Sequence, residues 1–278
     1  MLNGVEMSVV CVIQARMSST RLPGKVLMDV QGKPMLQLEL ERVKRSTTLD
    51  KVVIATSTDP SDDAIWDFCE SIQQPCFRGS LHDVMDRYCQ AAKANNANIV
   101  VRVTGDCPLI DYRVIDECAN KLKLGGCDLV GNHVYPTWPD GLDVEAFKFS
   151  ALEKANAECE HPFLREHVTL FIKYQPSIFK IGHVKNAKDL SRKRWTLDYQ
   201  EDYDLLKSVY DGLYENNQDF TTEDILKFLE KNPHLEESVK QYSRYDGIDV
   251  ALKESNIPFK MDGEVLELVF DSDEKGFK

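Results

Sequence analysis

Hydrophobic residues in the first half of the chain form short, nearly continuous runs, and amphipathic stretches lie between these runs. The runs are rich in β-branched residues and read as strands at 8–14 (SVVCVIQ), 51–57 (KVVIATS), 75–79 (PCFRG) and 98–106 (NIVVRVTGD). The stretches with helical spacing lie at 34–45, 62–72 and 81–94. Because the strands lack the alternation of a half-exposed sheet, we expect helices on both of their faces. The pattern predicts an α/β fold with a mostly parallel, doubly wound sheet.

A polar segment follows or ends each of these four strands. These segments are QARMSSTRLPGKVL (14–27), ATSTD (55–59), RGS (78–80) and TGDCPLID (104–111). The carboxyl ends of parallel strands meet at one edge of a sheet, and ligands of such sheets lie in the crevice beyond that edge. We therefore expect the four segments to surround one ligand site.

The pattern is looser after residue 124. We expect strands at 140–149 (DGLDVEAFKF) and 193–198 (KRWTLD), and helices at 162–174 (PFLREHVTLFIKY) and 199–214. There is no Gly/Ser/Pro linker and no internal repeat, so we predict one main domain over residues 1–242. A smaller β-containing insertion is expected at about 133–185, and residues 243–278 form a C-terminal extension.

The extension contains one strand-like run, VLELVF at 265–270. Its alternate residues Leu266, Leu268 and Phe270 would form a wholly apolar face that must be covered. A strand this short is not stable alone. We expect it to join a sheet edge of its own domain or of a second subunit.

Composition and charge exclude several classes of protein. The formal net charge of -12 argues against a general nucleic-acid or anionic-membrane binder, because both need a broad basic face. The N-terminal segment has no basic region, and its apolar run at 9–13 is too short for a signal peptide. We expect a cytoplasmic protein whose 8 scattered cysteines are reduced.

The segment 14–27 places Arg16, Arg21 and Lys25 in a loop of an otherwise acidic chain. It is not a Walker A loop, because one glycine precedes Lys25 and Val26 follows it. It is not a G-x-G-x-x-G dinucleotide fingerprint either. Two guanidinium groups and an ammonium suit a triphosphate whose β and γ groups leave as pyrophosphate. The alternative is a solvated basic turn that pairs with surface acids.

Two carboxylates strengthen the case for a nucleotide site. Asp106 ends a strand that we expect to be buried, and Asp198 ends a later one. Mg²⁺ is commonly held by one or two carboxylates together with substrate phosphate and water. The alternative is that Asp106 and Asp198 only cap the helices that follow them.

Several motifs together resemble a known family. They are VIQARMSSTRLPGKVL, VRVTGDCPLID, GLDVEAF, REHVTLFI and RWTLDYQED, in the family order, over about residues 8–229. The chain resembles the cytidylyltransferase-type family that includes the spore coat polysaccharide biosynthesis protein F group. More distantly it is similar to the synthetases that activate sialic acid and Kdo with CTP.

The resemblance implies a Rossmann-like nucleotidyltransferase fold. It also implies phosphate handling by the segment from Arg16 to Lys25 and metal binding at Asp106 and Asp198. The sialic acid synthetases usually carry a second acid two residues before the later position. This chain has Thr196 there, which is a departure from that pattern.

The same resemblance implies further binding residues. For the nucleotide these are Gln14, Ala15, Arg16, Lys25, Arg78, Gly79, Ser80 and Asp106; for the acceptor they are Asp143, Glu145, Glu166 and His167. The alternatives are a capped helix start with an ion pair at 78–80, a turn before a strand at 140–145, and a helix face with a satisfied histidine at 166–167.

We therefore expect a Mg²⁺-dependent nucleotidyltransferase that couples an NTP, with CTP favoured, to a sugar phosphate or sugar acid and releases pyrophosphate. Its product would serve surface polysaccharide or glycoconjugate synthesis. Because activating enzymes of this type commonly pair, a homodimer is favoured, with 243–278 as a contact. Two alternatives stay open: a metal-dependent glycosyltransferase that uses a nucleotide sugar, and a non-catalytic nucleotide-binding partner.

Overall fold

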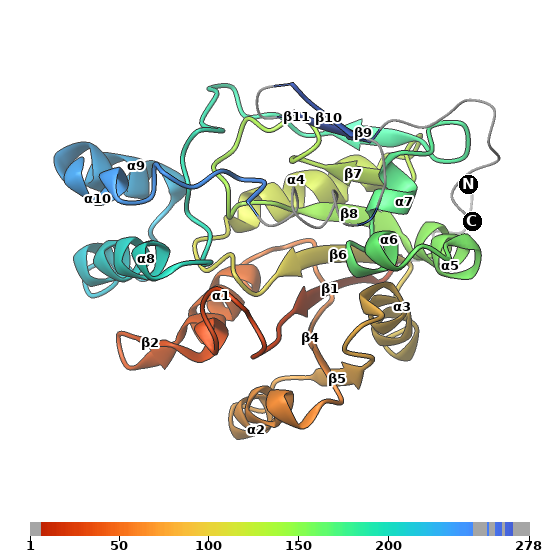
Figure 1. Cartoon of the computed structure of the whole chain (residues 1–278), viewed down its shortest axis with the longest axis horizontal. Coiled ribbons are helices and arrows are strands. Elements are labelled where there is room, and N and C mark those ends of the chain that lie inside the picture. Colours follow the sequence, from red (N-terminus) through yellow and green to blue (C-terminus); the bar gives the residue numbers. More distant parts are fainter. Residues whose placement is uncertain (1–6, 247–254, 256–258, 263–264, 269–278) are drawn as a thin grey trace.

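A seven-stranded sheet forms the centre of the computed structural model, in the order β5-β4-β1-β6-β8-β7-β9 (Figure 1). The structure describes residues 7–246, 255, 259–262 and 265–268. The strands of the sheet are β1 (Val9–Gln14), β4 (Lys51–Ser57), β5 (Cys76–Gly79), β6 (Ile99–Thr104), β7 (Leu129–Gly131), β8 (Glu145–Lys148) and β9 (Ile181–His183).

The strands from the first half of the chain are parallel, as predicted. Strand β1 pairs in parallel with both β4 and β6, and β4 pairs in parallel with β5. Strand β8 runs antiparallel to β6 and β7, whereas β9 is parallel to β7. The carboxyl ends of β1, β4, β5 and β6 therefore meet at one edge, and the mostly parallel α/β fold is confirmed.

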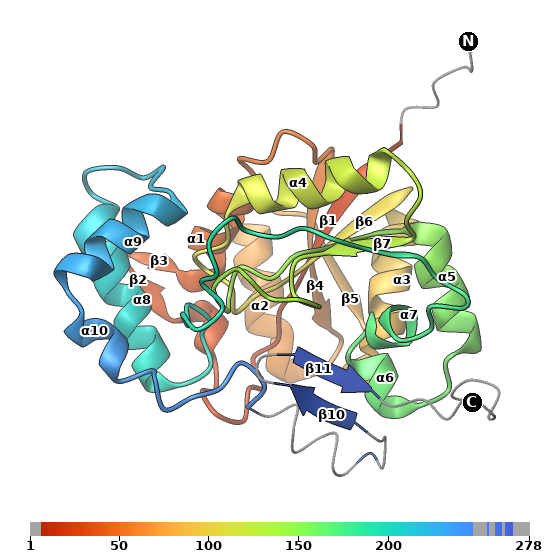
Figure 2. The ribbon, with the colours of Figure 1, turned by 90° about the horizontal axis from the view of Figure 1, so that it is seen from above.

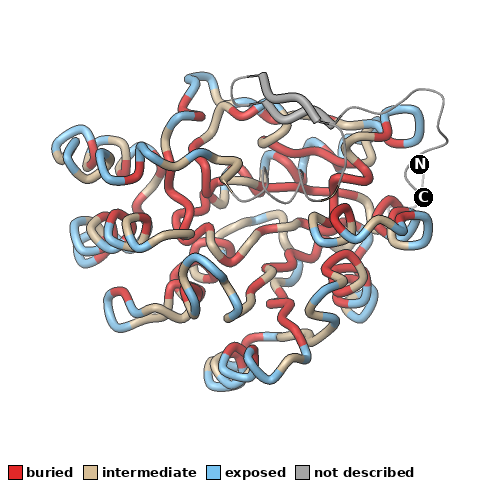
Figure 3. The backbone as a smooth tube through the Cα atoms, viewed as in Figure 1, coloured by how far each residue is buried: buried red, intermediate tan, exposed pale blue. Residues whose placement is uncertain are grey.

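Helices cover both faces of the sheet (Figure 2). Their bounds are α1 (Met35–Val43), α2 (Asp63–Ser71), α3 (Val84–Ala94), α4 (Tyr112–Lys123), α5 (Phe149–Glu158), α6 (Pro162–Glu166), α7 (Leu170–Lys173), α8 (Gln200–Leu213), α9 (Thr222–Lys231) and α10 (His234–Glu237). Val10 and Val12 of β1 pack with α3 and α5 to α7, whereas Cys11 and Ile13 pack with α1, α2 and α4. Both sets are fully buried, as Figure 3 shows along the central strands, which explains the continuous apolar run.

A third hydrophobic cluster joins helices α8 and α9 to α1. Helices α8, α9 and α10 lie together at the left of Figures 1 and 2, beside α1 and the hairpin of β2 (Asp29–Val30) and β3 (Lys33–Pro34). Trp195 and Leu197 pack into this cluster and are fully buried. None of the helices in the described part of the chain is long and apolar enough to cross a membrane.

Two expected elements are wrong. The helix expected at 162–174 is divided into α6 and α7. The break includes Val168, whose φ of 56° is unfavourable for a β-branched residue and interrupts the helix. The strand expected at 193–198 is reduced to a single bridge between Arg194 and Asp140. Its alternating apolar residues, Trp195 and Leu197, reflect burial in the third cluster and not strand pairing.

The expected C-terminal strand is present over the described residues 265–268. Strand β11 (Val265–Leu268) pairs antiparallel with β10 (Phe259–Asp262) of the same chain, in a separate two-stranded sheet. Residues 269–270 of the expected strand lie outside the described residues. Strand β11 therefore pairs with a strand of its own chain, β10.

Gly141 allows two distant segments to cross in close contact. Its φ is 95°, and a Cβ atom at this position would lie 2.5 Å from the carbonyl carbon of Trp195. The backbone of Asp140 also exchanges hydrogen bonds with the segment 193–195. This crossing holds the segment that leads to Asp198 against the sheet.

We expect Gly141→Ala to destabilise the protein more than Gly126→Ala. Gly126 has a similar φ of 86°, but no atom lies within 4 Å of a Cβ added there. The Gly126→Ala variant therefore measures the cost of backbone strain without a steric clash. That strain costs about 1 kcal/mol, and the steric clash at Gly141 adds about 1–3 kcal/mol. Urea denaturation measures both changes. Equal losses of unfolding free energy in the two variants would show that the close contact at Gly141 does not affect stability.

Glu39 of α1 is a fully buried carboxyl group. Burial raises its pKa well above the usual value, and the negative charge of Asp106 raises it further. A carboxyl group of this kind stabilises the folded state while it is protonated, and this contribution is lost as the pH rises towards the folded-state pKa.

We therefore expect Glu39→Gln to gain stability relative to the parent protein as the pH rises. Glutamine has nearly the same shape and cannot ionise, so the variant avoids the cost of the buried charge. Urea denaturation at several values between about pH 4 and pH 8 tests this, since the unfolded carboxyl titrates near pH 4. A stability difference that stays constant over this range would contradict the raised pKa.

Candidate active site

A cavity of about 170 Å³ opens at the edge where β1 and β6 end. It is lined by Gln14, Ala15, Arg16, Ser19, Thr20, Arg21, Lys25, Val26, Thr104, Gly105, Asp106 and Asp198. The structure thus brings together the basic loop and the carboxylates of Asp106 and Asp198, although no strand among the described residues leads to Asp198. Sequence reasoning did not single out Ser19, Thr20, Thr104 or Gly105.

Close backbone contacts shape the loop that carries the cations. The amide of Gly105 donates to the carbonyl oxygen of Gln14 at 2.7 Å, which draws the ends of β1 and β6 together. Buried Asp62 accepts from the amide of Met17 at 2.7 Å. The amide of Gly24 donates to the carbonyl oxygen of Met17 at 3.0 Å. The loop is therefore closed at its base, and Lys25 follows it in a short 3-10 helix, Lys25–Leu27.

Lys25 is at the centre of the cavity's charges. Its side chain is only 9% exposed, and Nζ lies 2.8 Å from Asp106 Oδ2 and 2.8 Å from Asp198 Oδ1. The third hydrogen bond goes to the carbonyl oxygen of Leu197 at 2.7 Å. Burial alone would lower the pKa of Lys25, but the two carboxylates outweigh it and raise the pKa. Lys25 is therefore a charged, buried group and not part of a solvated turn.

The pairing also keeps Asp106 ionised. Burial would raise the pKa of Asp106, but the ammonium of Lys25 lowers it to about 2. Hydrogen bonds to the carboxylate, including one from Thr104, add to this effect. Asp106 is thus an anion at any physiological pH.

The other two cations of the loop have different environments. Arg21 Nη2 lies 2.7 Å from Asp198 Oδ2, and its guanidinium lies over the ring of Tyr199 at 5.2 Å. Arg16 lies at the rim, with 41% of its side chain exposed and Glu166 3.9 Å away. Arg21 is therefore held in place, whereas Arg16 has solvent contact and a long, weak ion pair.

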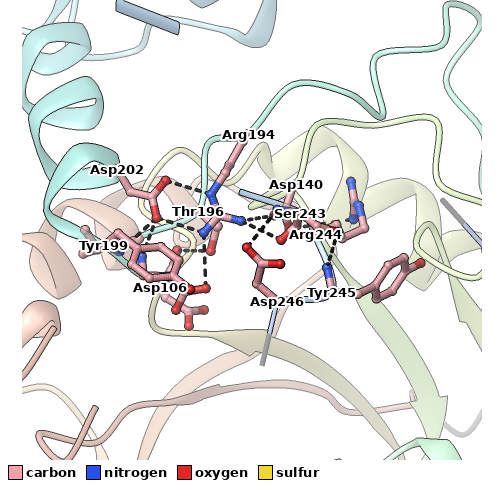
Figure 4. Close-up of polar contacts among 12 residues, drawn as sticks. Asp106, Asp140, Arg194, Thr196, Tyr199, Asp202, Ser243, Arg244, Tyr245 and Asp246 are labelled. Atoms are coloured by element: carbon pink, nitrogen blue, oxygen red, sulfur yellow. Dashed lines mark hydrogen bonds and ion pairs between the residues drawn. The ribbon is translucent and has the colours of Figure 1, made fainter. Parts of the chain in front are cut away.

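Asp198 is oriented by a buried ion pair that sequence reasoning missed (Figure 4). Arg194 Nε donates to Asp202 Oδ1 at 2.8 Å, and Asp202 Oδ2 accepts from the backbone amides of Asp198 and Tyr199. Arg194 Nη1 also donates to Asp140 at 3.1 Å. Arg194 and Asp202 both belong to the motif RWTLDYQED, but the sequence of the motif does not indicate that they form an ion pair.

Thr196 occupies the position where some relatives carry an acid. Its hydroxyl donates to the backbone carbonyl of Asp106 at 3.1 Å, and the amide of Leu197 donates to the same carbonyl at 2.9 Å. These bonds attach the segment before Asp198 to the end of β6. Thr196 therefore has a positioning role in this structure.

The donor set fits a magnesium ion that substrate and water help to hold. Asp106 and Asp198 approach the same ammonium group, so their carboxylates are near neighbours. Within the described residues there is no cluster of three or more His, Cys, Asp or Glu side chains suited to a metal. Two carboxylates suffice for Mg²⁺, which keeps several waters and binds substrate phosphates.

A second cavity of about 120 Å³ lies beside the first and shares Thr104 with it. It is lined by Arg102, Thr104, His133, Asp143, Glu145 and Lys173. Two of the expected acceptor residues, Asp143 and Glu145, are therefore here. Lys173 and His133 were missed because they stand in segments without a motif of their own.

The other two expected acceptor residues lie elsewhere. Glu166 lies beside Arg16 and lines a third cavity with it. His167 packs against Phe163, with ring centroids 4.4 Å apart. Burial lowers the pKa of His167 to about 3, so the imidazole is neutral.

Arg78, Gly79 and Ser80 lie outside the first cavity. Arg78 Nε donates to the carbonyl oxygen of Ser57 at 2.7 Å, and Nη2 lies 2.7 Å from Asp63. Arg78 thus joins the end of β4 to the start of α2. Contact of these three residues with a nucleotide base stays a prediction.

Comparison with known proteins agrees with this geometry. The family model described as cytidylyltransferase matches residues 10–238. The chain is 31% identical over 228 residues to the spore coat polysaccharide biosynthesis protein SpsF of Bacillus subtilis, covering 80% of this chain and 94% of that protein. It is 28% identical over 240 residues to a 3-deoxy-manno-octulosonate cytidylyltransferase of Pelobacter propionicus, covering 83% and 84%.

A solved structure is similar over most of the fold. It is a cytidylyltransferase from Leptospira borgpetersenii, with a TM-score of 0.79 and 36% sequence identity, covering 83% of this chain and 97% of that one. The family model, which matches residues 10–238, spans nearly the whole sheet, the basic loop, Asp106 and Asp198. The chain therefore belongs to the cytidylyltransferase family of nucleotidyltransferases.

Proposed function

We propose that this protein transfers the CMP group of CTP to a sugar acid or sugar phosphate, with release of pyrophosphate, for surface polysaccharide or glycoconjugate synthesis. The observation that carries the proposal is the contact of Lys25 with both Asp106 and Asp198 at the carboxyl edge of the sheet. A cation and two acids at one point suit both parts of the reaction, the charged triphosphate and the metal that accompanies it.

The leaving pyrophosphate would be bound by the basic loop. Nucleotidyl transfer proceeds by in-line attack on the α-phosphorus, and positioning and charge neutralisation supply most of the catalysis. Lys25 and Arg21 are held near the end of β1, and Arg16 stands at the rim. On binding, triphosphate oxygens would replace the carboxylates as partners of these cations.

Asp106 and Asp198 are the proposed ligands of Mg²⁺. The ion, when bound, would neutralise charge on the phosphates of the nucleotide. Arg194 and Asp202 would keep Asp198 oriented through the backbone amides of the helix start. Thr196 would do the same for the chain beside Asp106.

The need for a base depends on the acceptor. A sugar phosphate has a second pKa near 6 and is largely dianionic at neutral pH, so it needs no base. The hydroxyl group of a sugar acid must lose a proton. Glu145 is poorly suited to take it, because Arg102, Lys173 and Thr169 hold its pKa below the usual range despite burial.

Two other functions would give different products. A glycosyltransferase would release a nucleoside diphosphate from a nucleotide sugar, and a non-catalytic partner would release nothing. The family match favours nucleotidyl transfer over both. Pyrophosphate release from CTP with sugar acids and sugar phosphates would identify nucleotidyl transfer, and nucleoside diphosphate release from a nucleotide sugar would identify the glycosyltransferase. The homodimer also stays a proposal, which the solution mass of the full chain would test.

We expect Asp106→Asn to keep the fold and to lower kcat by at least about 100-fold, the scale of losing one electrostatic contact to the transition state. Asparagine has nearly the same shape but lacks the charge that would hold Mg²⁺. Asp128→Asn is the control, because Asp128 pairs with Lys148 away from both cavities. Activity of Asp106→Asn within a few-fold of the parent would refute the metal assignment.

We expect Lys25→Ala to raise the KM for CTP and to lower kcat, each by about tenfold or more, because a charge-assisted contact to phosphate is lost. Lys51→Ala is the control, since Lys51 is exposed at the start of β4. Steady-state kinetics at varied CTP measures both. If the two variants behave alike, the basic loop has no special part in nucleotide binding.

A further inference from the structure

Strand β6 leads from the second cavity to the first. Arg102 and Thr104 are alternate residues of the strand and face the same side, and Asp106 follows in the turn after the strand. Arg102 lines the second cavity, Asp106 lines the first and Thr104 lines both. A ligand lying along this face would therefore reach the Lys25 site with one end and Arg102 with the other.

The second cavity has an excess of hydrogen-bond donors. Its central acid, Glu145, is already occupied: Arg102 Nη1 donates to it at 2.6 Å, Thr169 donates to it, and Lys173 Nζ lies 3.4 Å away. Arg102 Nε finds no hydrogen-bond partner among the residues that the structure describes. An ammonium group has three donors and no acceptor. The cavity therefore has free hydrogen-bond donors for a ligand but few free acceptors.

Charge in the second cavity is also positive. Arg102 and Lys173 contribute two cations against the one carboxylate of Glu145. His133 adds none, because burial and the nearby ammonium of Lys173 lower its pKa to about 4. Two cations around a small, buried space are costly unless an anion joins them. This is unexpected in a chain with a net charge of -12.

The remaining acid, Asp143, is neutralised by a residue outside the family match. Arg244 Nη1 lies 2.8 Å and 2.9 Å from the two oxygens of Asp143, and Nη2 donates to the carbonyl oxygen of Trp138 at 2.8 Å. The family model ends at residue 238. Figure 4 shows the segment from Ser243 to Asp246 beside Asp140, and Arg244 Nη1 lies 3.9 Å from Asp140 Oδ1. The extension thus sets the charge of the second cavity.

We propose that the second cavity binds the acidic group of the acceptor, with Arg102 and Lys173 as its counterions, while Arg244 holds Asp143 away from that group. The acidic group is a carboxylate or a phosphate. The acceptor would lie along β6 and direct its reacting oxygen towards Asp106. This inference rests on the proposed function, since it concerns the second substrate of the same reaction.

The first test measures acceptor binding to the protein with CTP but without Mg²⁺, so that the metal-dependent reaction does not consume the acceptor. The probes are 3-deoxy-manno-octulosonate for the carboxylate, glucose 1-phosphate for the phosphate, and glucose as the neutral comparison. We expect one of the two acids to bind and glucose not to bind, by calorimetry. Lys173→Gln should weaken that binding by about tenfold or more, as the loss of a charge-assisted contact implies, and should leave the KM for CTP within about twofold. Lys180→Gln is the control, because Lys180 is exposed.

A second pair of variants tests the role of Arg244 by rescue. Arg244→Met should weaken binding of the acidic probe, because Asp143 then repels it. Adding Asp143→Asn should restore the binding to within about threefold, since no uncompensated charge is left. A purely structural role of the ion pair would not give this recovery. Lys240→Met is the control: Lys240 is an exposed cation shortly before the extension, and its loss should have no effect.

The outcomes separate this inference from the proposed function. Pyrophosphate release from CTP with any acceptor supports the function whatever the variants do. Unchanged binding of the acid in Lys173→Gln, equal binding of glucose, or no binding of either acid to the parent protein would overturn the acceptor site alone. If Lys173→Gln does not fold, the rescue of Arg244→Met by Asp143→Asn tests the acceptor site instead. Absence of pyrophosphate release with every acceptor would count against the function, while calorimetry would still report on the cavity.

Discussion

The contact of one buried ammonium with two carboxylates organises the site. Lys25 lies between Asp106 and Asp198, and Arg21 completes a set with equal numbers of positive and negative charges. Removing such groups from water is costly, and the cost is offset only when each charge keeps close partners. A triphosphate would add negative charge to this balanced set. We therefore propose that a further cation accompanies the nucleotide, and this balance of charge is the physical reason to expect Mg²⁺.

The sheet order decides how the two cavities relate. Strand β6 lies between parallel β1 and antiparallel β8, so it faces the basic loop on one side and Glu145 on the other. Arg102 is directly opposite Glu145 in the β6 and β8 register. One strand thus links the basic loop to the donor-rich cavity. Arg102 and Thr104 share a face of the strand, and Thr104 lines both cavities.

Much of the first half could be predicted because its signals are local. Strands covered on both faces need apolar runs, and β1, β4 and β6 each carry one. The second half misled the same reasoning. The run 193–198 alternates because Trp195 and Leu197 enter the cluster beneath α8, and the helix at 162–174 breaks at Val168. Apolar spacing records burial, and burial does not by itself specify strand or helix.

The sequence by itself determined which polar segments stand at strand ends, and so which residues can meet at one edge of the sheet. Gln14 to Lys25 and Asp106 follow from that rule, because strand order along the chain and parallel pairing place them together. Only the tertiary structure decided the pairs that join distant segments, such as Arg194 with Asp140 and Arg244 with Asp143. The partner of a charge depends on which segments pack against it, and that is a property of the whole fold.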